Sequence, residues 1–327
     1  MSRLAVFLMC PLLGHAAPLP AGGAVVSHSS IAFTMQEKDL LPENLAYDPR
    51  SGDFFVGSTR KGKVVRVTPG CHERDFVPAR AFGLWQVIGM KADPRRRLLW
   101  VLSSDGGNLV GHKPGNGNPA GLFKFDLDDG KLLAKYLLDE PGKVHFLNDL
   151  ALAADGDVYV THMFDAGQVW RLDAKTGTFA PFYSGDAAFH DPNGIALSAD
   201  GKRLYVASDE GISAIDLANR ARTPVADPAG FKLGGVDGLY VQGRTLVFLQ
   251  PDLKRVSRCE LTDGGLSAAH CAVLELNNPL FMHITTGVMV EGALYYIADS
   301  QFEAVGADGG LPPLDQLYQP VILKLDL

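Results

Sequence analysis

A short apolar phrase that ends in a tight turn recurs six times along this chain of 327 residues. Two clear copies are NDLALAADG from Asn148 and NGIALSADG from Asn193. Consecutive copies start between 44 and 60 residues apart, a period typical of arrays in which every copy is one structural unit. The fold must therefore repeat six similar units. The copies begin at Glu43, Ile88, Asn148, Asn193, Asp237 and Thr286.

Each copy is expected to open a β-hairpin. Asp-Gly and other glycine-containing turns between β-branched apolar runs are strong hairpin signals. The period leaves room for four short strands, and no segment between copies repeats every 3.6 residues, so strands alternating with helices are disfavoured. The sequence therefore predicts an all-β fold, a six-bladed β-propeller. The expected second strands cover residues 53–57, 98–102, 158–161, 204–207, 245–249 and 294–298.

The two ends of the chain predict how the ring closes. The last copy runs out after its third strand, at residues 320–327, whereas a β-like segment at residues 28–36 precedes the first copy. We expect this N-terminal segment to supply the missing outer strand, because pairing it there hides sheet edges that would otherwise be exposed. Residues 17–327 then form a single β-propeller domain.

The first residues resemble a secretory signal peptide. Arg3 is followed by an apolar stretch at residues 4–13 and then by small residues, so residues 1–16 are expected to be removed by cleavage after Ala16. The apolar stretch is too short to span a bilayer, and no later segment reaches the roughly 18 apolar residues that a spanning helix needs. We therefore expect a secreted or periplasmic protein with no membrane span.

The charge balance argues against nucleic acid as a partner. The chain has 30 basic and 37 acidic side chains and a net charge of −7, which leaves no basic field to hold a phosphate backbone. One dense basic run, at residues 95–97, lies between two strand-like segments with no second basic cluster nearby. We interpret it as a solvated turn rather than a phosphate site.

Two of the four cysteines predict a disulfide. Cys259 and Cys271 flank the turn at residues 262–265 at nearly equal distances, which would place them on neighbouring strands. An exported protein meets an oxidising environment, in which such a pair is joined. The alternative is two buried reduced thiols, because strand register cannot be fixed from sequence.

The residues that begin the copies carry the chemistry. In a propeller the first strand of each blade lines the central channel, so these residues should converge at one end of it. Two carboxylates and two amides there would be costly unless something satisfied them, and a hard divalent cation, Ca²⁺ foremost, does so. The alternative is turn chemistry with water, because Asn and Asp before Gly are common turn residues. The four candidate ligands are Glu43, Asn148, Asn193 and Asp237.

These four residues, with PNGIALSADGK from Pro192 and VDGL from Val236, resemble the regucalcin (senescence marker protein) and gluconolactonase family, and more distantly the paraoxonases and diisopropylfluorophosphatase. The resemblance runs from about residue 41 to the C-terminus. It implies a six-bladed propeller that holds one catalytic divalent metal through Glu, Asn, Asn and Asp and hydrolyses lactones or phosphotriesters. The implied ligands are the same four residues. Ca²⁺ is the favoured metal, with Mn²⁺, Mg²⁺ or Zn²⁺ as alternatives.

Two departures from the paraoxonases limit what the resemblance implies. Paraoxonases carry a histidine, proposed as a base, just before the second repeat, and Gln86 aligns with it here. They also hold a second, structural calcium through acidic residues next to the inner ligands. Asp149 matches this pattern, whereas the first repeat has Asn44. A histidine base of that kind is therefore not implied, and a second metal is left open.

Strand direction predicts that the loop after each second strand borders the metal. Two candidate substrate contacts follow, His162 and Gln301, and Gln86, at the position of the paraoxonase histidine, is the third. His162 directly follows a second strand and is suited to carry a proton near neutral pH; the alternative is a hydrogen-bonded loop residue. The glycine-rich insertion at residues 103–120 is interpreted either as a loop that covers the mouth or as a disordered spacer. Loops that enter the first strands add Trp85, His145, His190 and His283.

The sequence favours a secreted, metal-dependent hydrolase of lactone-type esters. The metal would polarise the carbonyl oxygen and activate a water molecule, roles that need no covalent nucleophile. Asp237 would serve as ligand and as proton acceptor, and Glu43 would anchor the metal. The substrate is expected to be a small-molecule lactone or ester, and sugar lactones, acyl lactones and aryl esters all remain open. The alternative is a non-enzymatic propeller that binds a metal or a small ligand in the same channel.

Overall fold

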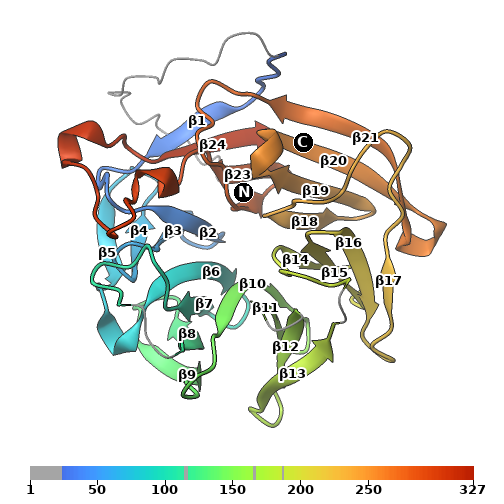
Figure 1. The fold of residues 1–327 in the computed structure, drawn as a ribbon, viewed down its shortest axis with the longest axis horizontal. Helices are drawn as coiled ribbons and strands as arrows, with labels where there is room; N and C mark the ends of the chain where they lie inside the picture. The colour runs from blue at the N-terminus through green and yellow to red at the C-terminus, as the bar shows by residue number, and fades with distance from the viewer. Residues whose placement is uncertain (1–23, 114–116, 165–166, 186–187) are drawn as a thin grey trace.

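The predicted six-bladed β-propeller is confirmed by a computed structural model, which describes residues 24–113, 117–164, 167–185 and 188–327 (Figure 1). Within these residues, six four-stranded antiparallel sheets, the blades, follow one another in chain order around a central axis. Helices in the described parts of the chain are three-residue 3₁₀ turns. The predicted signal peptide, residues 1–16, lies outside the described residues.

The blades are numbered from the N-terminus, and each is given from its inner to its outer strand. Blade 1 contains β2 (Pro42–Asp48), β3 (Asp53–Ser58), β4 (Lys63–Val67) and β5 (Glu73–Val77). Blade 2 contains β6 (Gln86–Asp93), β7 (Leu98–Ser104), β8 (Ala120–Asp126) and β9 (Leu132–Leu138). Blade 3 contains β10 (Phe146–Leu152), β11 (Val158–Met163), β12 (Gln168–Leu172) and β13 (Phe179–Ser184).

The second half of the ring repeats this plan, and every predicted second strand is present. Blade 4 contains β14 (Ile195–Leu197), β15 (Arg203–Ser208), β16 (Gly211–Asp216) and β17 (Arg222–Pro224). Blade 5 contains β18 (Leu239–Gln242), β19 (Thr245–Gln250), β20 (Arg255–Thr262) and β21 (Ser267–Leu276). Blade 6 contains β22 (Gly287–Val290), β23 (Ala293–Ile297), β24 (Val321–Asp326) and β1 (Ser30–Thr34).

Blade 6 closes the ring as predicted, because the N-terminal strand β1 is its outer strand. β1 pairs antiparallel with β24, with Ser30 opposite Lys324 and Thr34 opposite Val321. The first and last strands of the propeller therefore belong to one sheet, so the ring cannot open without breaking this ladder. Figure 1 shows the two strands side by side at the top of the view.

A buried carboxylate ties the start of this closing segment to blade 5. Glu275, near the end of β21, accepts hydrogen bonds from His28 N (2.5 Å) and Ser29 N (2.7 Å). Its second oxygen accepts from Asn278 Nδ2 at 2.8 Å. Glu275 is fully buried, so these donors take the place of water around its charge. The N-terminal segment is therefore held by two blades.

The core lies between the blades rather than inside any one of them. In the described part of the chain, six hydrophobic clusters each fill the space between two neighbouring blades. In the cluster between blades 1 and 2, Phe55 and Val64 of blade 1 lie with Leu99, Val101 and Phe123 of blade 2. Both faces of the middle strands are covered, and this explains why β3 and β7 are buried along their whole length.

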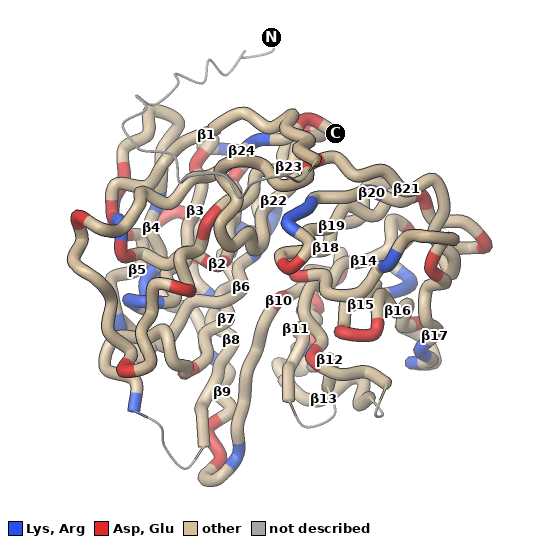
Figure 2. The backbone as a smooth tube through the Cα atoms, turned by 45° about the horizontal axis from the view of Figure 1, so that its top comes forward, with Lys and Arg blue, Asp and Glu red and all other residues tan. Residues whose placement is uncertain are grey.

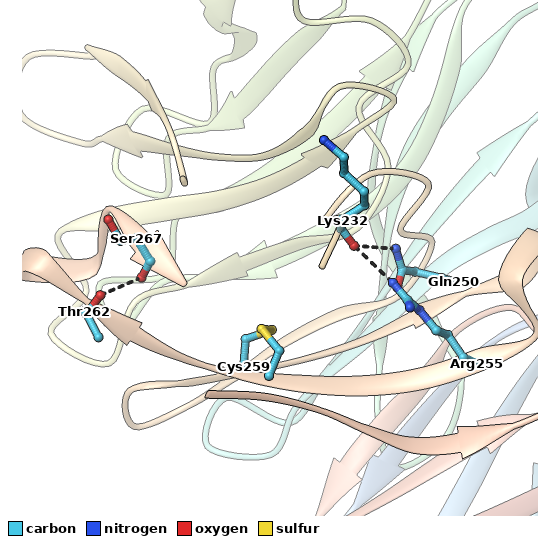
Figure 3. Close-up of a disulfide and its surroundings, with 7 residues drawn as sticks. Lys232, Gln250, Arg255, Cys259, Thr262 and Ser267 are labelled. Carbon is cyan, nitrogen blue, oxygen red and sulfur yellow. Dashed lines mark hydrogen bonds between the residues drawn. A yellow bond between two sulfur atoms is a disulfide. The ribbon is translucent and has the colours of Figure 1, made fainter. Parts of the chain in front are cut away.

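The outer half of blade 5 carries a disulfide between Cys259 of β20 and Cys271 of β21 (Figure 3). The two strands are antiparallel neighbours, and their register shifts between Arg258 and Glu260. This shift brings the two cysteines opposite one another, with 4.1 Å between their Cα atoms. The sulfur of Cys259 lies in the cluster between blades 4 and 5.

Charged residues of both signs are interspersed along the chain around the ring (Figure 2). In the basic run at residues 95–97, Arg97 makes two 2.8 Å hydrogen bonds to the buried carboxylate of Asp48 and also contacts Asp128 at 2.6 Å. Arg97 therefore joins the turn of blade 1 to blade 2 as a structural ion pair. Across the described residues, no helix is both long enough and apolar enough to cross a membrane.

Ring closure can be tested at Glu275. We expect Glu275→Ala to lower the free energy of unfolding by about 1–3 kcal/mol, because the donors of residues 28, 29 and 278 lose a buried acceptor. Amide hydrogen exchange in β1 should accelerate as well. Glu260→Ala, which removes an exposed carboxylate from the neighbouring strand β20, is the matched control and should leave both unchanged. Equal denaturation midpoints for the two variants would contradict the proposed role of Glu275.

Candidate metal centre

The repeated phrase begins with a β-bulge in the inner strands of blades 1, 2 and 3. The register of β2 with β3, of β6 with β7 and of β10 with β11 shifts at the first two residues of each phrase. A bulge interrupts the alternation of side chains and re-aims them, and bulges are common next to active sites. The bulged pairs are Glu43–Asn44, Ile88–Gly89 and Asn148–Asp149.

Asn193 and Asp237 occupy the equivalent positions of blades 4 and 5, just before β14 and β18. Asn193 N donates to Ala207 O (2.9 Å), and Ala207 N donates to Gly194 O (2.9 Å). The backbone of Ala207 in β15 therefore pairs with both Asn193 and Gly194. Leu249 faces Asp237 and the residue after it in the same way, through two 3.0 Å hydrogen bonds. The repeated phrase therefore gives the four candidate ligands similar backbone settings, one in each of four blades.

The loop that leads to Asp237 is held in place by two side chains from β19 and β20 (Figure 3). Gln250 Nε2 donates to Gly234 O at 2.6 Å, and Arg255 Nη2 donates to Lys232 O at 3.1 Å. Arg255 Nε also donates to Gln250 Oε1 at 2.6 Å. The backbone before Asp237 is thus fixed by hydrogen bonds that do not involve the channel.

Glu43 and Asp237 are buried carboxylates that lie close enough to affect one another. Burial raises the pKa of Glu43 well above its usual range, and the negative charges of Asp237 and Asp149 raise it further. Burial also raises the pKa of Asp237 to about 6, although a nearby histidine and a hydrogen bond from Asn193 partly oppose the rise. A bound cation would therefore stabilise the ionised forms of both carboxylates.

The donor atoms at this end of the channel fit a hard divalent cation. Asn193 Oδ1 and Asp237 Oδ1 are buried and have no hydrogen-bond partner among the described residues. Asn148 Nδ2 donates to Met163 Sδ at 3.0 Å, which leaves the amide oxygen as its acceptor. Where the chain is described, no three His, Cys, Asp or Glu side chains gather into a metal-binding group. The fit to Ca²⁺ therefore depends on amide oxygens that supplement two carboxylates.

The two remaining positions of the inner ring have other roles. Thr286 Oγ1 donates to Glu43 O at 2.7 Å and accepts from Asn44 Nδ2 at 2.9 Å, so blade 6 fixes the backbone that carries Glu43. Ile88 is buried and apolar.

Two of the three predicted substrate contacts lie beneath the loops of the mouth. Gln86 is buried, and Gly106 of the insertion lies directly against its amide group. The approach is so close that a Cβ atom at position 106 would lie 2.7 Å from Gln86 Oε1. His162 is buried, its Nε2 lies 2.9 Å from Nδ1 of His145, and its ring stacks on Trp170. Both side chains are positioned by neighbours and stay predictions as substrate contacts.

The third predicted contact, Gln301, is bound to the backbone. Its Nε2 donates to Lys38 O (3.1 Å) and Tyr318 O (3.0 Å), and its Oε1 accepts from Tyr318 N (2.9 Å). Both ends of the amide therefore hold the segment after β1 against residues 298–320, the long loop of blade 6 between β23 and β24. Gln301 therefore has a structural role.

A group of titratable side chains surrounds His283, which the sequence places in a loop that enters a first strand. His283 Nδ1 lies 2.6 Å from Glu303 Oε1, and the charge of His283 also acts on Asp237 and Asp299. Burial raises the pKa of Asp299 to about 6. Glu303 lies in the loop after the second strand of blade 6, which the sequence places at the mouth, and the same rule could have found Asp299.

The insertion at residues 103–120 packs against the mouth over its described part. Arg60 is buried, and its Nη1 donates to Asn108 O (3.0 Å) in the insertion and to Gly309 O (2.8 Å) in the long loop of blade 6. Val110 N donates to Arg60 O at 3.0 Å, and His112 bonds Asp105 within the insertion. These contacts support the interpretation of the insertion as a covering loop.

Comparison with solved structures shows the fold that this chain shares. It resembles the Malassezia sympodialis allergen Mala s 1, with a TM-score of 0.67, 18% identity, and coverage of 89% of this chain and 95% of that one. It also resembles a gluconolactonase from Xanthomonas campestris (TM-score 0.60, 15% identity, 96% and 99% covered). The PQQ-bound aldose sugar dehydrogenase from Streptomyces coelicolor is similar to the same degree (0.60, 15%, 94% and 99%). No family model and no curated protein matches the sequence.

These findings define the chain as a six-bladed propeller of the architecture found in gluconolactonase and in luciferin-regenerating enzyme. The solved structures that resemble this chain also include a lyase and a dehydrogenase. Fold similarity therefore leaves the reaction to be argued from the residues of the channel.

The buried carboxylates predict an unusual pH dependence for the metal-free protein. The folded state keeps the proton of Asp237 up to about pH 6, whereas the unfolded chain releases it near the ordinary pKa of 3.8. The folded state binds more protons in this window, so its stability should fall as the pH rises through it, by on the order of 3 kcal/mol. Ca²⁺ binds the ionised carboxylates and should offset this loss at neutral pH.

Thermal unfolding of chelator-treated protein at about pH 4.5 and about pH 7, with and without Ca²⁺, measures this effect. Asp237→Asn should reduce both the loss on raising the pH and the stabilisation by Ca²⁺. A melting temperature that does not respond to Ca²⁺ at neutral pH would contradict the assignment of Asp237 as a ligand.

Proposed function

We propose that this chain is a metal-dependent hydrolase of lactone-type esters. The proposal rests on one observation above all: Glu43 and Asp237 are buried together at one end of the channel, where Asn193 and Asp237 present oxygens with no hydrogen-bond partner among the described residues. Such a set is costly unless it binds a cation. We also propose export of the protein, on the strength of the signal-like residues 1–16.

The metal would be held by Glu43, Asn148, Asn193 and Asp237, and the oxygen-only set favours Ca²⁺. A divalent cation at this position would supply a Lewis acid for the carbonyl oxygen of the substrate. Glu43 contributes charge and is itself held from blade 6 by Thr286. Asn148 and Asn193 contribute oxygens without adding charge.

Asp237 is suited to accept the proton of the attacking water. Burial raises the pKa of Asp237 to about 6 in the metal-free protein, and a bound cation would lower it, so the carboxylate would be ionised at neutral pH and able to accept a proton. The oxygen Oδ1 lacks a hydrogen-bond partner among the described residues, whereas Asn193 fixes the carboxylate through a hydrogen bond. His283, whose charge acts on Asp237 and whose Nδ1 lies 2.6 Å from Glu303 Oε1, would pass a proton on toward the mouth.

Support for this reaction class comes from gluconolactonase, which shares the fold over nearly the whole of both chains. The covering loop and the long loop of blade 6, joined by Arg60, would limit access of water to the site. A small-molecule lactone or ester is therefore the proposed substrate.

Hydrolysis of a panel of sugar lactones, acyl lactones and aryl esters tests the proposal. We expect turnover that a chelator abolishes and that Ca²⁺ restores better than Mg²⁺, Mn²⁺ or Zn²⁺. Glu43→Gln and Asp237→Asn should each lower kcat/KM by at least about 100-fold, because a metal ligand that supplies several kcal/mol of transition-state stabilisation is lost. The exposed Glu260→Gln is the control and should retain full activity.

Full activity in both channel variants would overturn the assignment of the site. Stoichiometric metal binding without turnover of any substrate in the panel would instead favour the non-enzymatic binding propeller.

A further inference from the structure

Lys91 places a positive charge inside the channel, on the inner strand β6 of blade 2. Its Nζ lies 3.5 Å from Asp149 Oδ1 on the inner strand of blade 3. The same Nζ lies 5.4 Å from the centre of the Tyr240 ring, which belongs to the inner strand of blade 5. The ammonium group is thus held by an ion pair and a cation–π contact from two other blades.

Asp149 is the residue at which the resemblance to paraoxonases left a second metal open, and its surroundings do not fit one. The carboxylate is buried, and it accepts hydrogen bonds from Leu150 N (2.8 Å) and Ile195 N (3.4 Å) in addition to its contact with Lys91. A divalent cation on Asp149 would stand within a few ångströms of the Lys91 ammonium. Repulsion between like charges at that distance opposes its binding.

The charges of the channel balance with one divalent cation. Glu43, Asp149 and Asp237 carry three negative charges that act on one another through the channel. Lys91 contributes one positive charge, and a single divalent cation contributes two, so the group is neutral. A second divalent cation would leave two uncompensated positive charges in a buried setting, which is strongly unfavourable.

We infer that Lys91 is an internal cation that takes the place of a second metal ion and limits the channel to one divalent cation. The inference rests on the metal site of the proposed function, and it assigns Lys91 as a positioning residue rather than a catalytic one. Through Asp149, Lys91 also sets the charge that Glu43 and Asp237 experience.

Lys91 also borders a cavity at the other end of the channel. Lys91 lines a cavity of about 270 Å³ whose other walls include Tyr47, Met289 and Glu291. Residues 47 and 291 lie at the turn ends of the inner strands β2 and β22, so the cavity is at the far end of the channel from the candidate metal ligands.

The test counts Ca²⁺ ions per chain in wild-type protein and in Lys91→Met, which keeps the length of the side chain and removes its charge. Equilibrium dialysis against saturating Ca²⁺, followed by elemental analysis, gives the count without any assay of activity. We expect one ion per wild-type chain and two per Lys91→Met chain. Lys91→Arg keeps the charge and should bind one ion. Lys91→Met/Asp149→Asn removes the second ligand and should return the count to one.

Two ions in the wild-type chain would overturn the inference even if Lys91→Met fails to fold, and one ion in folded Lys91→Met would overturn it as well. Folding of each variant is checked by circular dichroism. One ion in the wild type without turnover of any lactone would refute the proposed function and leave the inference on Lys91 standing. No ion in the wild type would overturn both.

Discussion

The burial of three carboxylates in one narrow channel is the constraint on which the rest of this structure depends. Burial raises the pKa values of Glu43 and Asp237, and the negative charge of Asp149 raises both further. Lys91 compensates one charge from within the chain. The remaining two require either protons or a divalent cation, and this requirement links stability, pH dependence and the proposed catalysis in one site.

A closed ring is well suited to hold such a site. The core lies between the blades, so each inner strand is fixed by both of its neighbours, and β1 completes blade 6 so that no blade interface is left open. Bulges then set the direction of the inner side chains without disturbing the strands behind them. A rigid frame of this kind can keep like charges close together because the chain cannot relax to separate them.

The repeats predicted the fold because each phrase contains its own hairpin signal. Alternation and turn residues are local, so the second strands and even the closing role of β1 could be inferred before any pairing was known. The positions of Glu43, Asn193 and Asp237 at strand starts follow from the same period. The bulges that orient them are not visible in the sequence, because a bulge is a property of register between two strands.

Contacts between blades were beyond the reach of the sequence. The pairing of Lys91 with Asp149 depends on which faces the blades turn toward one another. The contact of His145 with His162 lies within blade 3 and depends on the register of β10 with β11. Gln301 looked like a mouth residue by position, yet its amide bonds the backbone at Lys38 and Tyr318, segments far apart in the chain. Lys91 lies within a repeat phrase at a position where most copies are apolar, and this exception was the one local signal of its role.

The most direct test of this account is an anomalous difference map from crystals grown with Mn²⁺ in place of Ca²⁺. The account predicts one peak in the channel, within about 2.6 Å of oxygens from Glu43, Asn148, Asn193 and Asp237, and none on Asp149. A channel without a peak, or a peak coordinated by Asp149 in place of Glu43 and Asp237, would contradict it.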